Sequence, residues 1–142
     1  MGYRTILAVL AALLVSACSG IPQRTSDKVQ LERFQQYAGE PVSSVPYLGR
    51  YDSWRPLGRD NLVIWTGIND AYLLTVAGAC FDLPFKHRIA IKSRGPTLSR
   101  GDSVIVGRGQ SCMITEIRPV DYRKMKQDAK AKQQEEASSA SN

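Results

Sequence analysis

The spacing of apolar residues along the chain changes from a helical pattern to a strand pattern near residue 60. Before that point, residues 27–38 carry apolar side chains at intervals that favour a helix with one face on the protein core. Ser26–Asp27 is suited to cap its first turn, and Gly39 follows its last turn. Residues 40–60 are rich in turn-forming residues. The apolar positions expected on the helix face are Val29, Leu31, Phe34 and Tyr37, and the aromatic residues expected in the core or at its rim are Tyr51 and Trp54.

From Asn61 onward, apolar and polar residues alternate in short runs, a pattern typical of antiparallel strands. Glycine-containing turns predict two hairpins, one around residues 67–70 and one around residues 107–110. Pro119 is expected to end the last strand. The predicted strands are residues 61–66, 71–77, 88–93, 103–106 and 111–117.

These elements predict an α+β protein that is mostly β. We expect a small antiparallel curled sheet or partly open barrel, with the N-terminal helix packed on it. A chain of 142 residues suits one globular domain, which is predicted over residues 27–120. Residues 121–142 are rich in Lys, Gln, Ala and Glu and are predicted to form a marginally helical or disordered tail. The tail is either a solvated spacer or a helix that binds a partner.

Residues 6–15 form the only long apolar run, ILAVLAALLV. A membrane-spanning helix needs about 20 apolar residues, so this run is too short for a permanent span. With Arg4 before it and small residues after it, the run is typical of a secretory signal over residues 1–17.

The signal ends in Val15-Ser16-Ala17-Cys18, which resembles the lipobox of bacterial lipoproteins. The resemblance implies cleavage between Ala17 and Cys18 and lipid on Cys18, followed by a polar tether over residues 18–26. Stable anchoring takes two or more acyl chains, which a triacylated cysteine provides. Ser19 stands where the inner-membrane retention signal of enteric bacteria has Asp, so we expect an outer-membrane anchor with the domain facing the periplasm. The alternative is ordinary secretion with a chance cysteine.

The cysteine count supports a disulfide. Of the three cysteines, Cys18 is assigned to lipid, which leaves Cys80 and Cys112 as an even pair. The oxidising periplasm favours a bond between them, which would close a loop of roughly 33 residues and contribute about 3–4 kcal/mol of stability. The alternative is a nucleophilic cysteine with His87, the only histidine, as its base. We expect no metal site and no cofactor, because one histidine and two distant cysteines form no ligand cluster.

The net charge of +6 arises from 19 basic and 13 acidic residues. This excess is too small and too dispersed to predict nucleic acid as a partner. It is concentrated between residues 86 and 108, where alternation places Arg88, Lys92 and Arg94 on the outward face of one strand. That face is a candidate contact for an anionic envelope component or another envelope protein. Alternatively, it is a solvated face whose charges discourage edge pairing.

Motifs of known chemistry give no candidate active site. Arg100-Gly101-Asp102 spells an adhesion tripeptide, but it precedes a strand, where Gly and Asp suit a turn. Gly107-x-Gly109 lacks the third glycine and the helix of a dinucleotide-binding loop. Spacing selects no catalytic pair among the available carboxylates, Asp52, Asp60, Asp70 and Asp82.

Five stretches together resemble a family of short, uncharacterised proteobacterial lipoproteins whose domain has no assigned function. The resemblance spans roughly residues 50–120 and implies periplasmic exposure and pairing of the two cysteines. It brings no catalytic residues. The stretches are AYLLTV (71–76), CFDL (80–83), IAIKS (89–93), GDSVIV (101–106) and CMITEIRPV (112–120).

The leading hypothesis is therefore a non-enzymatic outer-membrane lipoprotein that acts as a binding or structural module of the cell envelope. Two other classes remain open. A periplasmic enzyme would need a cleft with convergent polar groups, and a soluble secreted factor would require Cys18 to be unmodified.

Overall fold

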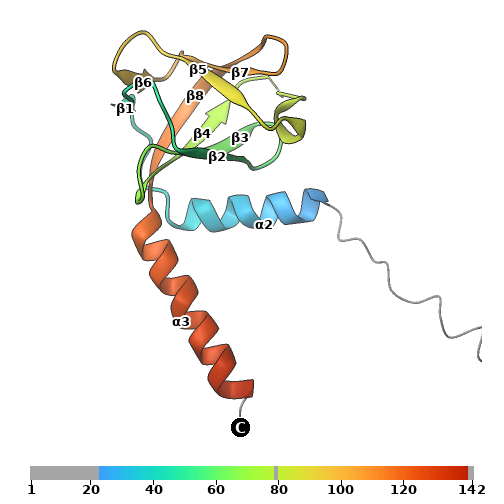
Figure 1. Ribbon diagram of the computed structural model, residues 1–142, viewed down its shortest axis with the longest axis vertical. Coiled ribbons are helices and arrows are strands. Elements are labelled where there is room, and N and C mark those ends of the chain that lie inside the picture. The colour runs from blue at the N-terminus through green and yellow to red at the C-terminus, as the bar shows by residue number, and fades with distance from the viewer. Residues whose placement is uncertain (1–22, 79, 141–142) are drawn as a thin grey trace, which may run out of the picture.

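The computed structural model describes residues 23–78 and 80–140 (Figure 1). The elements are the helix α2 (Gln23–Gln36), the strands β1 (Ser44–Pro46), β2 (Ser53–Pro56), β3 (Asn61–Trp65) and β4 (Asp70–Val76), the 3-10 helix η2 (Leu83–Phe85), the strands β5 (Ile89–Lys92), β6 (Thr97–Ser99), β7 (Ser103–Val106) and β8 (Gln110–Asp121), and the helix α3 (Tyr122–Ala140). The predicted lipobox and tether lie outside these residues, except for the last four positions of the tether, where α2 has already begun.

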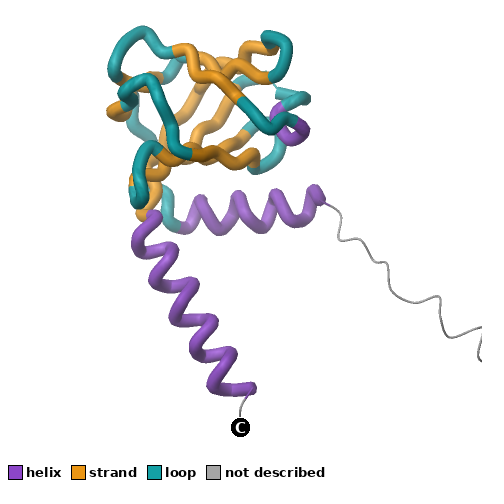
Figure 2. The backbone as a smooth tube through the Cα atoms, in the orientation of Figure 1, coloured by secondary structure: helices purple, strands orange, loops and turns teal. Residues whose placement is uncertain are grey.

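Six strands form one antiparallel sheet in the order β2-β3-β4-β8-β7-β5, and the sheet curls into a half-barrel (Figure 2). The hydroxyl of Tyr51, just before β2, donates a 2.6 Å hydrogen bond to the carbonyl of Ile89 in β5. This bond joins the two outer edges of the sheet. The structure confirms the predicted partly open antiparallel barrel and both predicted hairpins. It also confirms the rim position of Tyr51.

The sequence pattern did not predict three short strands. β2 forms one edge of the main sheet, and β1 and β6 pair with each other in a separate sheet. β1 and β6 each contribute one buried apolar residue, Val45 and Leu98, to the core inside the half-barrel. Single inward positions flanked by turns give no alternation to detect, which is why the sequence pattern missed them.

The central strands are buried on both faces. In β4, Leu74 and Val76 face the core inside the half-barrel, while Ala71 and Leu73 face a second core on its outer side. Phe34 of α2, 2% exposed, belongs to this outer core. The predicted packing of the helix on the sheet is confirmed.

The predicted ends of this helix were wrong. Ser26 lies within α2 and does not cap it. Gly39 continues into an extended segment, where its N–H donates to the carbonyl of Pro119 at 2.8 Å. Val29, predicted on the buried face, is 54% exposed.

Pro119 does not end β8, which continues to Asp121. A residue's N–H and C=O point to the same side of a strand, and the carbonyl of Pro119 accepts the Gly39 N–H. The missing N–H of Pro119 therefore faces the segment after α2 and removes no bond from the β4–β8 ladder. An edge position of this kind is where proline is tolerated.

The C-terminal tail, predicted to be marginally helical or disordered, is helical over Tyr122–Ala140. Asp121 caps it, because its Oδ1 accepts the backbone N–H of Lys124 at 3.0 Å. Only Met125 of this helix is buried. The helix projects from the body of the protein (Figure 1).

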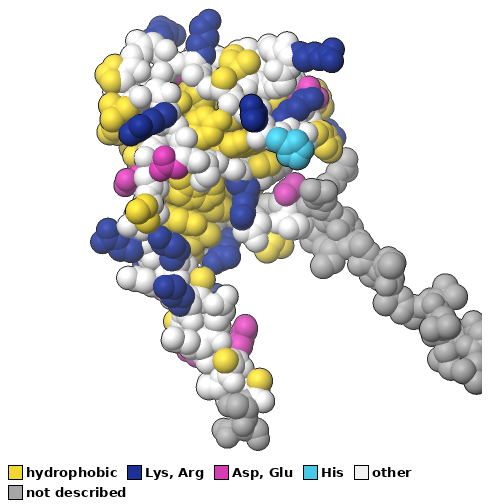
Figure 3. Space-filling view, in the orientation of Figure 1, with side chains coloured by type: hydrophobic (Ala, Val, Ile, Leu, Met, Phe, Trp, Pro, Cys, Tyr) yellow, Lys and Arg dark blue, Asp and Glu magenta, His cyan; other side chains and the backbone are white. Residues whose placement is uncertain are grey.

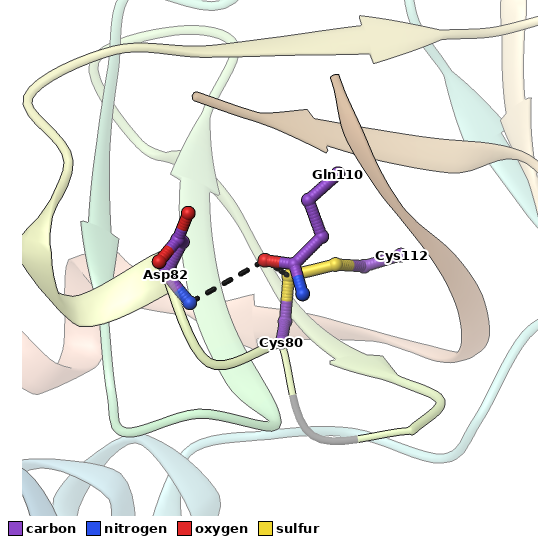
Figure 4. Close-up of a disulfide and its surroundings, with 4 residues drawn as sticks. All are labelled: Cys80, Asp82, Gln110 and Cys112. Atoms are coloured by element: carbon purple, nitrogen blue, oxygen red, sulfur yellow. Dashed lines mark hydrogen bonds between the residues drawn. A yellow bond between two sulfur atoms is a disulfide. The ribbon is translucent and has the colours of Figure 1, made fainter. Parts of the chain in front are cut away.

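Cys80 and Cys112 form a disulfide, as predicted (Figure 4). Their Cα atoms lie 6.0 Å apart, and both residues belong to the core inside the half-barrel. The bond fastens the segment before η2 to β8.

We predict that replacing Cys80 and Cys112 together with Ala lowers the free energy of unfolding by about 3–4 kcal/mol, because the reduced chain gains loop entropy when it unfolds. Chemical denaturation of the two proteins measures the difference. Thiol titration of the denatured, unreduced wild type should find neither residue free. Two titratable thiols would contradict the disulfide.

Candidate functional site

A groove of about 740 Å³ lies between α2, α3 and the edge of the sheet at β2. Four of its lining residues are aromatic, and we call it the aromatic groove. α2 provides Phe34, β3 provides Trp65 and the first turn of α3 provides Tyr122, while Trp54 of β2 borders the groove with its side chain packed against the core inside the half-barrel. A pocket of this size and composition falls within the range of small-molecule sites.

Trp65 is at the centre of these aromatic contacts. Its ring meets those of Phe34 and Tyr122 edge to face, with centroids 5.9 and 5.5 Å away. This arrangement suits aromatic quadrupoles. The indole N–H of Trp65 is buried and has no hydrogen-bond partner among the described residues. Buried donors almost always have a partner, so this N–H is an exception among the described residues.

Positive side chains border the aromatic surface. Arg33, Arg55, Lys126 and Lys130 line the groove, and Asp52 is the only carboxylate among its described lining residues. Figure 3 shows the hydrophobic surface between the sheet and α3 with Lys and Arg side chains around it. Lys126 is held in place, because its Nζ donates to Asn69 Oδ1 at 2.8 Å and lies 5.0 Å from the Tyr122 ring. The groove is therefore suited to a ligand with an apolar part and a negative charge.

A cluster of three side chains, which we call the clasp, fastens α3 to the end of α2. Asp128 Oδ2 accepts a hydrogen bond from the Tyr37 hydroxyl at 2.8 Å and another from Lys124 Nζ at 3.0 Å. The hydrogen bond from Lys124, followed by that from Tyr37, lowers the pKa of Asp128. The same bonds to Asp128 raise the pKa of Tyr37 and of Lys124.

The predicted basic strand face is present in part. Ile89 is buried while Arg88 and Lys92 are exposed, so the predicted alternation is confirmed. Neither Arg88 nor Lys92 forms an ion pair with a described residue. Arg94 differs, since its Nε lies 3.9 Å from Oδ1 of Asp102, which is 5% exposed.

Asp102 also explains the adhesion tripeptide. Its Oδ2 accepts the backbone N–H of Ser99 at 2.8 Å, and Gly101 adopts a φ of 91°. The tripeptide is a turn with a buried carboxylate, as its position before a strand predicted.

The other candidate chemistry is not brought together. Both sulfur atoms of the cysteine pair are in the disulfide, so neither is available as a thiolate nucleophile beside His87. Among the described residues, no three His, Cys, Asp or Glu side chains are grouped so as to hold a metal ion. Of the four acidic candidates, Asp52 lines the aromatic groove and Asp60 lines a separate hollow.

Sequence reasoning missed the aromatic groove. Its walls come from three segments that are far apart in the chain, and the tail was expected to be a spacer or a partner-binding helix. One sequence signal was available in part, since Trp65, one of the two tryptophans of the protein, is at the centre of the groove's aromatic contacts.

The chain belongs to a family of unknown function, DUF6491, whose model matches residues 1–136. The match is longer than the stretch of residues 50–120 on which the resemblance rested. No curated protein and no solved structure matches the chain. Within the part of the chain that the structure describes, no helix is long and apolar enough to cross a membrane.

We predict that α3 stays docked between about pH 4 and pH 10 and loosens on either side. The lowered pKa of Asp128 gives a contribution that is present above its unfolded-state pKa and lost as the pH falls through its folded-state pKa. The raised pKa values of Tyr37 and Lys124 give contributions that are lost as the pH rises through their folded-state values.

The measurement is the methyl NMR shift of Met125, which is 5% exposed, with Met113, 50% exposed on β8, as an internal reference. Asp128→Asn should remove the acid transition of Met125, because the amide has no charge to lose. An acid transition that is unchanged in the variant would show that the clasp does not hold α3.

Proposed function

We propose that this protein is a binding module of the bacterial cell envelope, attached to the outer membrane by lipid on Cys18 and facing the periplasm. It acts by binding and carries out no reaction. The lipobox-like Val15–Cys18 supports the anchor, and the disulfide fits an oxidising compartment. An enzyme and a soluble secreted factor are the alternatives, and the Cys18 test below separates the second from the proposal.

The observation that carries this proposal is the aromatic groove. Aromatic rings offer apolar contact, and the bordering cations favour a negative group. Envelope lipids and glycolipids combine apolar chains with phosphates. The ligand class we propose is an anionic amphiphile of the envelope.

We predict that Cys18→Ala abolishes fatty-acid labelling and releases the domain into the soluble periplasm, because no acyl chain then holds it. Membrane fractionation and labelling of cells measure both effects. Ser19→Asp is the matched variant, which should keep the lipid and move the protein to the inner membrane. Membrane attachment of Cys18→Ala at the wild-type level would overturn the anchor.

We predict that dodecyl phosphate binds the unlipidated domain more tightly than dodecyl maltoside, whose head group is neutral. Trp65 faces the groove, whereas Trp54 packs against the core inside the half-barrel, so a change in intrinsic fluorescence on binding should come from Trp65. Arg55→Glu with Lys130→Glu should weaken dodecyl phosphate binding roughly tenfold, since each exposed charge contributes a few tenths to about 1 kcal/mol. Neither side chain forms an ion pair with a described residue, so folding should be little changed.

The control carries the same charge change on the basic strand face, Arg88→Glu with Lys92→Glu. Arg94 is left unchanged, because a carboxylate there would face the buried Asp102. Equal loss in both double variants would indicate a general effect of net charge. Loss confined to the strand-face variant would transfer the site to the sequence-predicted face, and the absence of any fluorescence response would reject the groove.

A further inference from the structure

Two phenylalanines are exposed on the loop around η2. Phe81 is 56% exposed and Phe85 is 72% exposed, while Leu83 between them is fully buried. We call residues 81–86 the Phe loop. Large aromatic side chains that stay exposed in pairs mark an interaction site more often than single exposed apolar residues do.

The Phe loop is held in this form by several independent contacts. The disulfide fixes Cys80, directly before it, and the backbone N–H of Asp82 donates to Gln110 Oε1 at 3.4 Å (Figure 4). The N–H of Phe85 donates to the carbonyl of Asp82 at 3.0 Å. Arg59 lies 5.2 Å from the centre of the Phe81 ring. The two rings are therefore presented by a fastened turn, which lowers the entropy cost of binding through them.

The Phe loop lies next to the first half of α2. Pro84 and Phe85 line a hollow together with Asp27, Lys28 and Leu31 of that helix. In Figure 2, the short helical turn of η2 lies on the same side of the molecule as the start of α2.

This position is close to the proposed anchor. Gln23, where α2 starts, lies five positions after Cys18, and five residues reach at most about 17 Å. A lipid on Cys18 therefore keeps the start of α2, and the loop beside it, within a short distance of the bilayer surface.

We propose that the Phe loop inserts into the interfacial region of the bilayer that holds the Cys18 lipid. This inference rests on the proposed lipid anchor. The Phe81 and Phe85 rings would enter the boundary between head groups and acyl chains, where apolar side chains gain from burial. Arg59, whose guanidinium lies over the Phe81 ring, and Lys86, which follows Phe85 and pairs with Asp82 at 3.8 Å, would lie at the level of the lipid phosphates. The contact would fix how the aromatic groove faces the periplasm.

The protein has only three phenylalanines, Phe34, Phe81 and Phe85, which allows a direct test. The mature chain, Cys18–Asn142, labelled with para-fluorophenylalanine, gives three fluorine NMR lines. Its Cys18 thiol, the one outside the disulfide, is coupled to a maleimide lipid in nanodiscs of phosphatidylethanolamine and phosphatidylglycerol. Phe81→Tyr and Phe85→Tyr assign the lines.

Lipid with a nitroxide near the top of the acyl chain should remove most of the intensity of the Phe81 and Phe85 lines. The line of Phe34, 2% exposed in the outer core, should keep its intensity. A water-soluble gadolinium chelate should affect Phe81 and Phe85 less in the nanodisc than in free protein. Leu48→Phe supplies an exposed control, because Leu48 is 79% exposed just after β1, which lies on the opposite side of the molecule from the start of α2 (Figure 1). Its line should respond to the chelate and not to the lipid nitroxide.

The proposal is overturned if the lipid nitroxide affects Phe81 and Phe85 no more than Phe34, or if Phe at position 48 responds equally. Chelate access that is unchanged by the nanodisc would also overturn it and would direct attention to a protein partner for the loop. Coupling through maleimide makes this result independent of natural lipidation. A failure of the Cys18 anchor in cells and a failure of loop insertion are therefore separate outcomes.

Discussion

The pairing of β8 determines where almost every other element lies. This strand has 12 residues, and it pairs with β4 along its second part and with β7 along its first part. A bulge between Thr75 and Val76 of β4 marks where the two pairings meet, and bulges increase local twist and bend. Because one continuous strand serves both halves, the sheet can curl without interruption until Tyr51 reaches Ile89 across its open side. Cys112, also on β8, adds a covalent link to the same strand.

Burial of the central strands on both faces has a second effect on the fold. In β3, Leu62, Val63 and Ile64 are all buried, with Val63 on the outer side of the half-barrel. An outer apolar face has to be covered, and α2 covers it through Phe34. The helix reaches over only part of that face, so Trp65 and Tyr122 are left to line a groove beside it. The candidate site is thus a product of how a short helix and a curled sheet fit together.

Local patterns predicted what depends on neighbours in the chain. The two hairpins, the inward position of Ile89 and the pairing of Cys80 with Cys112 followed from alternation, turn residues and cysteine count. Features that depend on contacts between distant segments were not predictable in this way. Pro119 was wrongly predicted to end the strand, because the side of β8 that its missing N–H faces is occupied by the segment at Gly39, 80 positions earlier in the chain. The sequence of the tail predicted only a marginal helix. Its stabilising contacts depend on distant segments, because Asp121 caps it from the end of β8 and Met125 is buried in the outer core with Phe34 of α2.

α2 and α3 leave the sheet from the same place, with mechanical consequences. Ala38 bridges to Val120, and the N–H of Asp121 donates to the carbonyl of Tyr37 at 2.9 Å, so the two helices meet at a common corner (Figure 1). The clasp crosses between them about two turns along α3, close to that corner. α3 is therefore a lever with its pivot at β8. At 19 residues it is roughly 28 Å long, so a rotation of about 10° at the pivot would move its free end by roughly 5 Å. A small rotation at the corner would therefore become a large displacement at the far end of α3. The position of that end would report the width of the space between the two helices.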